Sequence, residues 1–188
     1  MSLNSWVETL NATQIDSTAL TNTVTATSII APQSRFTIPA NFFAIGKTIR
    51  VRALGRISTV VTTPGTLTLD LRFGASTVQF NGGAMSLNIV AKTNVSWSYE
   101  AYLTCRSIGN STLATLLGIG TWASEAVILS GLPTVSTNGI FVLPAATPVV
   151  GTGFDSTVSN VLDMFGTWSV ANAANSIQTH LFTVEAMN

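Results

Sequence analysis

The sequence predicts an all-β fold, an antiparallel β-sandwich of the jelly-roll type, and three observations lead to it. Residues 66–73 alternate strictly between polar and apolar side chains, and residues 95–106 do the same over a longer run. Successive side chains of a strand point to opposite faces, so both runs predict strands with one dry and one wet face. Turn residues recur between such runs, and no segment carries apolar residues at helical spacing. Roughly eight to ten strands are expected.

The stretch 47–74 holds two of these strands. Residues 47–59 alternate as well, but the parity shifts around Ala53, where Gly55 predicts a β-bulge. Pro64-Gly65 separates this run from 66–73 and is a typical turn signal. We therefore expect the two runs to form a β-hairpin.

The remaining strands follow from the same alternation. In chain order they are predicted at 23–31, 35–39, 76–80, 85–92, 95–106, 112–129, 139–143, 160–170 and 176–186. Asn81-Gly82-Gly83 is expected to be a turn, and 112–129 a strand with a bulge, because Gly118 and Gly120 disfavour a helix. Residues 1–22 fit no period and predict an N-terminal segment or arm, followed by a single domain over 23–188.

Charge is scarce in this chain. Only 9% of the 188 residues are charged, against about 25% in typical domains, and the mean hydropathy is +0.45. A Thr-rich sheet surface explains part of this composition. A surface covered by other subunits explains it better, since interface cores are depleted in charge. We therefore expect a homo-oligomer.

Several classes of partner are disfavoured. The net charge is zero and the first basic residue is Arg35, so no basic arm is available for nucleic acid. The longest charge-free segment, 126–154, is broken by Gly and Pro and cannot form a membrane helix. No secretion signal is visible at the N-terminus, and the lone Cys105 is expected in the core, without a disulfide.

Catalytic chemistry is not expected. His180 is the single histidine and lies in the middle of a predicted strand, with no carboxylate placed beside it by the sequence. Asp155 and Asp163 could form an acid pair, but Asp155 fits a loop-fixing role and Asp163 is the polar member of an alternating strand. No nucleotide loop, nucleophile elbow or metal-ligand spacing is present. We expect no enzyme activity, cofactor or bound metal.

Aromatic residues give the candidate contact sites. Trp and Tyr anchor interfaces and stack on sugars when they are exposed. Trp97 belongs to the inward set of its strand, Trp168 fits either environment, and Tyr102 lies on a clearly polar face. The candidate interface residues are Trp6, Tyr102, Trp122, Phe141 and Phe154.

Several blocks of the sequence resemble a family of tailed-phage virion proteins. At the C-terminus they are Val149-Val-Gly-Thr-Gly-Phe-Asp-Ser-Thr157, Leu162-Asp-Met-Phe-Gly-Thr-Trp-Ser169 and residues 175–185. Further blocks lie at 50–58, 63–74 and 81–85, so the resemblance covers most of the chain from about residue 29 onward. The family carries no catalytic motif that could be transferred.

The resemblance implies a jelly-roll-like structural subunit of a virion, assembled in the host cytoplasm. Among virion proteins, small neutral β domains often act as head decoration, or cement, proteins, typically as trimers, and the expected partner is the major capsid protein of the same virion. The alternative is a tail-tip or fibre-head domain that binds a host glycan through exposed aromatics. A lectin-like domain outside any virus is a third possibility.

Overall fold

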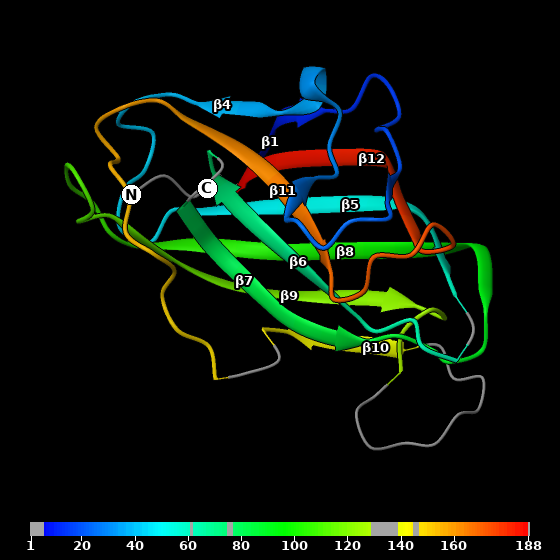
Figure 1. Cartoon of the computed structure of the whole chain (residues 1–188). Coiled ribbons are helices and arrows are strands. Elements are labelled where there is room, and N and C mark those ends of the chain that lie inside the picture. The colour runs from blue at the N-terminus through cyan, green and yellow to red at the C-terminus, as the bar shows by residue number, and fades with distance from the viewer. Residues whose placement is uncertain (1–5, 61, 75–76, 129–138, 145–146, 188) are drawn as a thin grey trace.

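The computed structural model describes residues 6–60, 62–74, 77–128, 139–144 and 147–187. Its regular structure in these ranges is β, apart from one short 3₁₀ turn, η1 (Pro32–Ser34). Two antiparallel sheets face each other, and the strands of the smaller sheet cross those of the larger one diagonally (Figure 1). This arrangement confirms the predicted β-sandwich.

Sheet A has seven strands and sheet B has five. The order in sheet A is β1 (Val7–Ala12), β12 (Ser176–Met187), β5 (Thr48–Thr59), β8 (Lys92–Ser107), β9 (Thr115–Ser124) and β10 (Gly139–Leu143), with β2 (Leu20–Thr21) also paired to β12. The order in sheet B is β3 (Thr27–Ser28), β11 (Asn160–Trp168), β6 (Thr66–Phe73) and β7 (Thr77–Ser86), with β4 (Phe36–Ile38) also paired to β11.

The core lies between the two sheets and follows the predicted alternation. Leu69 of β6 and Leu103 and Cys105 of β8 are fully buried, as their parity predicts. Trp97 of β8 stacks on Trp122 of β9 with ring centroids 5.1 Å apart and planes 15° apart. Burial of such large apolar side chains is the main favourable term in the stability of the sandwich.

The predicted hairpin between 47–59 and 66–73 is wrong. β5 pairs with β12 and β8 in sheet A, whereas β6 pairs with β11 and β7 in sheet B. The Pro64-Gly65 turn therefore carries the chain from one sheet to the other. Both strands keep one dry face, because each packs that face against the opposite sheet.

The predicted bulge at Gly55 is also displaced. β5 alternates regularly through Gly55, and the extra residue is His180 on the neighbouring β12, where Thr179 pairs with Gly55 and Leu181 with Leu54. Gly55 is required for a different reason. A Cβ atom there would lie 1.9 Å from the carbonyl oxygen of Gln178 and 2.9 Å from Cε2 of Trp97.

The N-terminal part is integrated into the sandwich rather than forming a separate arm. Residues 7–12 and 20–21 are strands of sheet A, both paired to β12. Between them, Ser17 donates its backbone N–H to the carbonyl of Thr179 at 2.9 Å. The boundary expected at residue 22 therefore does not separate an arm from the domain in the described residues.

Three shorter segments differ from expectation as well. β7 continues through Asn81-Gly82-Gly83 with a shift of register, so no turn ends the strand there, and it stops at Ser86 instead of opening a strand over 85–92. The strand expected at 23–31 is reduced to the two residues of β3. β9 is regular, and the irregularity of that pair lies in β8, between Cys105 and Ser107.

Candidate functional site

The outer face of sheet A is an exposed surface built from regular structure. Its side chains form rows that run across the strands, as the strand register dictates. One row reads Ile140, Ala123, Ser98, Leu54 and Leu181, from β10 to β12. The next rows read Val142, Thr121, Glu100, Arg52 and Thr183, and then Ile119, Tyr102, Arg50, Glu185 and Thr9. We call these three rows the neutral face.

The charges of the neutral face are paired within it. Arg50 forms an ion pair with Glu185, and Arg52 forms one with Glu100 at 3.1 Å. The hydrogen bond that Arg50 donates to Glu185 raises the pKa of Arg50 above its ordinary value, so this guanidinium stays charged. The Tyr102 hydroxyl donates to Glu100 at 2.6 Å. The face therefore carries no net charge in any of its three rows.

Apolar side chains stand exposed between these pairs. On β10, Ile140 and Val142 have relative exposures of 65% and 67%, and Ile119 of β9 is exposed to 45%. Leu54 and Leu181, which pair across β5 and β12, are also exposed. Contiguous apolar residues of this kind mark surfaces that bind a partner.

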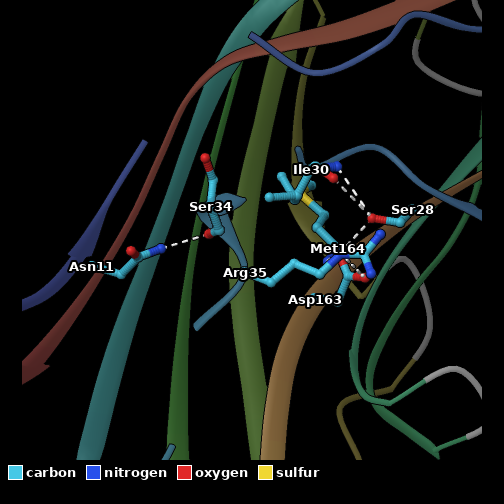
Figure 2. Close-up of polar contacts among 7 residues, drawn as sticks. All are labelled: Asn11, Ser28, Ile30, Ser34, Arg35, Asp163 and Met164. Carbon is cyan, nitrogen blue, oxygen red and sulfur yellow. Dashed lines mark hydrogen bonds and ion pairs between the residues drawn. The ribbon is translucent and has the colours of Figure 1, made fainter. Parts of the chain in front are cut away.

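The second polar feature lies on sheet B, around Asp163 of β11. Its Oδ1 accepts hydrogen bonds from the Ser28 hydroxyl at 2.7 Å and the Met164 N–H at 2.8 Å, and its Oδ2 pairs with Arg35 Nε at 3.0 Å. Figure 2 shows Ser28, from β3, and Arg35, from the chain between η1 and β4, converging on this carboxylate. Burial raises the pKa of Asp163, although Ser28 and Arg35 oppose that rise.

This cluster is a structural clamp. Both oxygens of Asp163 are occupied by partners that hold η1 and β3 against β11. Asn11 of β1 fastens the other side of η1 by donating from Nδ2 to the Ser34 carbonyl at 2.6 Å (Figure 2). A carboxylate engaged in this way is not available as a general base.

A neighbouring ion pair completes the clamp on sheet B. Asp70 and Arg72 of β6 pair at 2.9 Å, and the Arg72 guanidinium lies 4.4 Å from the ring centroid of Phe165. Burial raises the pKa of Asp70, while its bond to Arg72 lowers it. The cation–π contact joins β6 to β11, and the ion pair holds the Arg72 side chain in place within β6.

The five candidate interface residues divide into two groups. Trp6 and Tyr102 are exposed, and Tyr102 belongs to the neutral face. Trp122 and Phe154 are buried in the core, so their assignment as surface contacts is wrong for the folded subunit. Trp122 lies on the buried parity of β9, together with Gly118 and Gly120. Phe154 packs against Phe73, with ring centroids 4.8 Å apart. Phe141 is half-buried, with its side chain against the core.

The residues considered for catalysis are also assigned by their contacts. His180 lies at the bulge of β12, with Nδ1 2.9 Å from Oδ1 of Asp16, and both side chains are substantially exposed. Asp155 accepts from the Thr157 hydroxyl at 2.6 Å and from the N–H groups of Ser111 and Thr157, which lowers its pKa and fixes the loop, as predicted. Asp155 and Asp163 therefore have separate partners and do not act as a pair.

In the ranges that the structure describes, no three His, Cys, Asp or Glu side chains gather closely enough to hold a metal ion. No helix in the same ranges is long and apolar enough to cross a membrane.

Sequence reasoning missed the apolar part of the neutral face. Leu181 shares its parity in the sequence with the inward residue Ile177, and the bulge at His180 reverses that assignment. The shift of parity predicted around Ala53 kept Leu54 from being assigned to the outer face of β5. Neither residue carries a local signal that reveals its exposure.

The described residues define an antiparallel β-sandwich with an exposed and neutral sheet face. No protein-family model matches the chain, and no curated protein matches it. Among solved structures, the chain is similar to the CBM2 module of the evolved Dit of Lactobacillus casei BL23 phage J-1. The identity is 10%, the match covers 99% of this chain and 98% of that chain, and the TM-score is 0.36. At this TM-score the likeness carries no functional argument.

Proposed function

We propose that this protein is a non-enzymatic structural protein of a bacteriophage particle and that it acts by binding a partner through the neutral face. The observation that carries the proposal is this face, in which every charge is paired and apolar side chains stand between the pairs. The resemblance of several sequence blocks to tailed-phage virion proteins supports the proposal that the protein belongs to a bacteriophage particle.

The first candidate partner is the major capsid protein of the same virion. A decoration subunit that binds only the assembled shell stabilises it by mass action, by about 2.7 kcal/mol per site at a hundredfold excess over Kd. A flat, neutral sheet face suits such a contact, because it can bury apolar area without leaving an unpaired charge.

The second candidate is a receptor-binding domain at the tail tip or fibre head. Exposed Tyr102 and Trp6 favour it, since aromatic side chains stack on sugar rings. The two candidates differ in location and copy number. Many copies on the head fit decoration, and a few copies on the tail fit receptor binding.

Genome release tests the decoration candidate. Particles that lack this protein should release their genome at a lower temperature than complete particles, and adding the purified protein should restore the difference. Gold-labelled antibody on complete particles gives the location. Equal release curves together with label confined to the tail would reject decoration in favour of receptor binding.

A single substitution tests the face itself. Leu54→Asp places an unpaired carboxylate in the row of the neutral face that carries no charge and should abolish binding to particles without changing Tm. Val24→Asp is the matched control, because Val24 is exposed and lies outside the sheets. Full binding by Leu54→Asp would contradict the proposal, wherever the protein resides in the particle.

A further inference from the structure

A hollow of about 670 Å³ lies on the outer face of sheet A, beside the neutral face. It shares Ile140 and Ala123 with the first row of that face. Beyond them it extends to Arg56 and Ser96, which pair across β5 and β8. The volume falls within the roughly 300–1,000 Å³ that small-molecule sites occupy. The hollow is therefore large enough for a ligand of the size of a sugar ring.

Arg56 is the cationic group of this hollow. Its side chain is exposed and lines the hollow, and its Nη1 donates to the carbonyl of Asn94, another lining residue, at 3.2 Å. This bond holds the guanidinium at the wall of the hollow. A guanidinium has five N–H donors. Because the side chain is exposed, the donors that Asn94 does not use are accessible to a ligand.

Within the described ranges, no carboxylate pairs with Arg56. Six of the eight Asp and Glu side chains form ion pairs with other basic residues. Asp155 is bonded within its own loop. Glu8 pairs with Ala186, at the opposite end of β12 from the residue that pairs with Arg56. The residues outside the described ranges carry no charged side chain. A side-chain carboxylate that binds Arg56 therefore belongs to another molecule.

The opposite wall of the hollow carries an acceptor. Glu125 lines the hollow and follows Ser124, which pairs with Trp97 of β8. This register places Ser96 between Glu125 and Arg56. Two strand spacings therefore separate the backbones of the acidic and the basic residue, a distance of about 10 Å.

These groups define the chemistry of a ligand. Arg56 favours a carboxylate, because a guanidinium and a carboxylate form two parallel hydrogen bonds. Glu125 already lies 3.6 Å from the Lys92 ammonium, so it suits a hydroxyl donor better than a second cation. Ile140, which is exposed to 65%, offers apolar surface to C–H groups. A ring that carries one carboxylate, several hydroxyls and a C–H face meets all three requirements.

We propose that this hollow binds an acidic sugar of the uronic acid class, with the sugar carboxylate on Arg56 and ring hydroxyls on Glu125 and Ser96. The Ser96 hydroxyl both donates and accepts, so it suits either side of a ring hydroxyl. The inference does not rest on the proposed function, because its central group, Arg56, lies outside the three rows of the neutral face. It holds wherever the protein lies in a particle.

Saturation-transfer NMR tests the site with the full chain. The probes are glucuronate and galacturonate, each alone, with retention on immobilised polygalacturonate and hyaluronan as a second arm for polymeric sources. Glucose and galactose lack the carboxylate, and acetate lacks the ring. At least one uronate should bind at least tenfold more tightly than acetate and the matching neutral sugar. Its binding should weaken as the ionic strength rises.

A matched pair of arginine variants tests the assigned cation. Arg56→Gln should weaken the Kd of the bound uronate at least tenfold. Arg106→Gln is the control, because Arg106 is an exposed residue of sheet A without an ion pair in the described ranges and lies outside the hollow. It should bind as the wild type does. In ¹⁵N spectra of the wild type, the uronate should shift the Nε–H signal of Arg56 and leave that of Arg106 in place.

A third variant keeps the test decisive if Arg56→Gln does not fold. Ala123→Trp fills the hollow from a half-exposed position and should abolish uronate binding. The proposal is overturned if no free or polymeric uronate binds, or if acetate or a neutral sugar binds as tightly. It is also overturned if Arg56→Gln or Ala123→Trp binds as the wild type does. Equal weakening by Arg106→Gln would indicate general attraction of anions and would overturn it as well.

Discussion

At the scale of single residues, Trp97 illustrates how the core is specified. Its ring stacks on Trp122, and its Nε1–H lies 3.2 Å from the carbonyl oxygens of both Arg56 and Gln178. Those two carbonyls belong to β5 and β12, so one side chain links three neighbouring strands of sheet A. The N–H group of the buried indole therefore has hydrogen-bond acceptors, and its ring has an apolar neighbour.

Charge placed on the two faces of a strand should have opposite consequences. Leu69→Asp and Trp97→Asp should unfold the protein, because burying an unpaired carboxylate costs several kcal/mol against a total stability of about 5–15 kcal/mol. Thr68→Asp and Ser98→Asp lie on the outward parity and should change the free energy of unfolding by less than about 1 kcal/mol. Urea denaturation measures all four. Equal damage from the outward pair would contradict the assigned faces.

Two aspartates should make opposite contributions to the pH dependence of stability. Burial raises the pKa of Asp163 above its ordinary value of 3.8, so the folded state binds its proton more readily than the unfolded state does. The unfavourable contribution of this carboxylate at neutral pH should disappear as the pH falls through that raised pKa. Hydrogen bonds lower the pKa of Asp155, so its stabilising contribution should be present above pH 3.8 and lost as the pH falls through the lowered pKa.

The measurement is the free energy of unfolding against pH for the wild type, Asp163→Asn and Asp155→Asn. Relative to Asp163→Asn, the wild type should gain stability on acidification. Relative to Asp155→Asn, it should lose stability. A loss relative to Asp163→Asn would contradict the assigned environment of Asp163, and a gain relative to Asp155→Asn would contradict that of Asp155.

At the scale of elements, β12 depends on one extra residue. Ile177 and Thr179 face the core before the bulge, and Phe182 and Val184 face it afterwards. A regular strand with the same residues would point the second pair outward. The bulge at His180 therefore keeps both halves of β12 in the core.

Deletion variants test this account of β12. Removing His180 should leave a folded protein, because Thr179 and Leu181 then become adjacent and the remaining residues alternate regularly. Removing Ser98 from the regularly alternating stretch of β8 should unfold the protein, because the side chains from Tyr99 to Cys105 then move to the opposite face. Near-UV circular dichroism distinguishes the two results. Loss of tertiary signal on deleting His180 would show that the bulge itself is needed.

At the scale of the whole molecule, scarcity of charge is the dominant property. With 9% charged residues, the surface relies on Thr, Ser and Asn for solvation. Of the six ion pairs in the described ranges, two lie in the neutral face, one joins Arg35 to β11 and one lies within β6. A surface of this kind resists association less than an ordinary one does, because few like charges repel.

We expect the protein to self-associate, with a trimer as the predicted state. Light scattering at micromolar concentration should give three times the 19.7 kDa mass of one chain. Raising the ionic strength should change this mass little, because the charges of the neutral face are already paired within the subunit. A single species of 19.7 kDa at every concentration would contradict the prediction.

Local alternation determined most of the strands and the inward residues. Side chains of β6, β8 and β11 lie where their parity places them, because the pleat of a strand assigns faces two residues at a time. The same reasoning identified the loop role of Asp155 and the burial of Cys105. These properties depend on residues that are neighbours in sequence.

Tertiary structure alone decided which strands pair and which surfaces remain open. Pro64-Gly65 is a sound turn signal, yet the turn joins two sheets, because pairing is chosen by long-range packing and not by the turn. The bulge at His180 lies beside the tight contact of Gly55 with Gln178 and Trp97, three residues that are distant in sequence. The bulge places Leu181 at the surface beside Leu54. The neutral face exists for the same reason, since it is assembled from strands that meet only after the chain has folded.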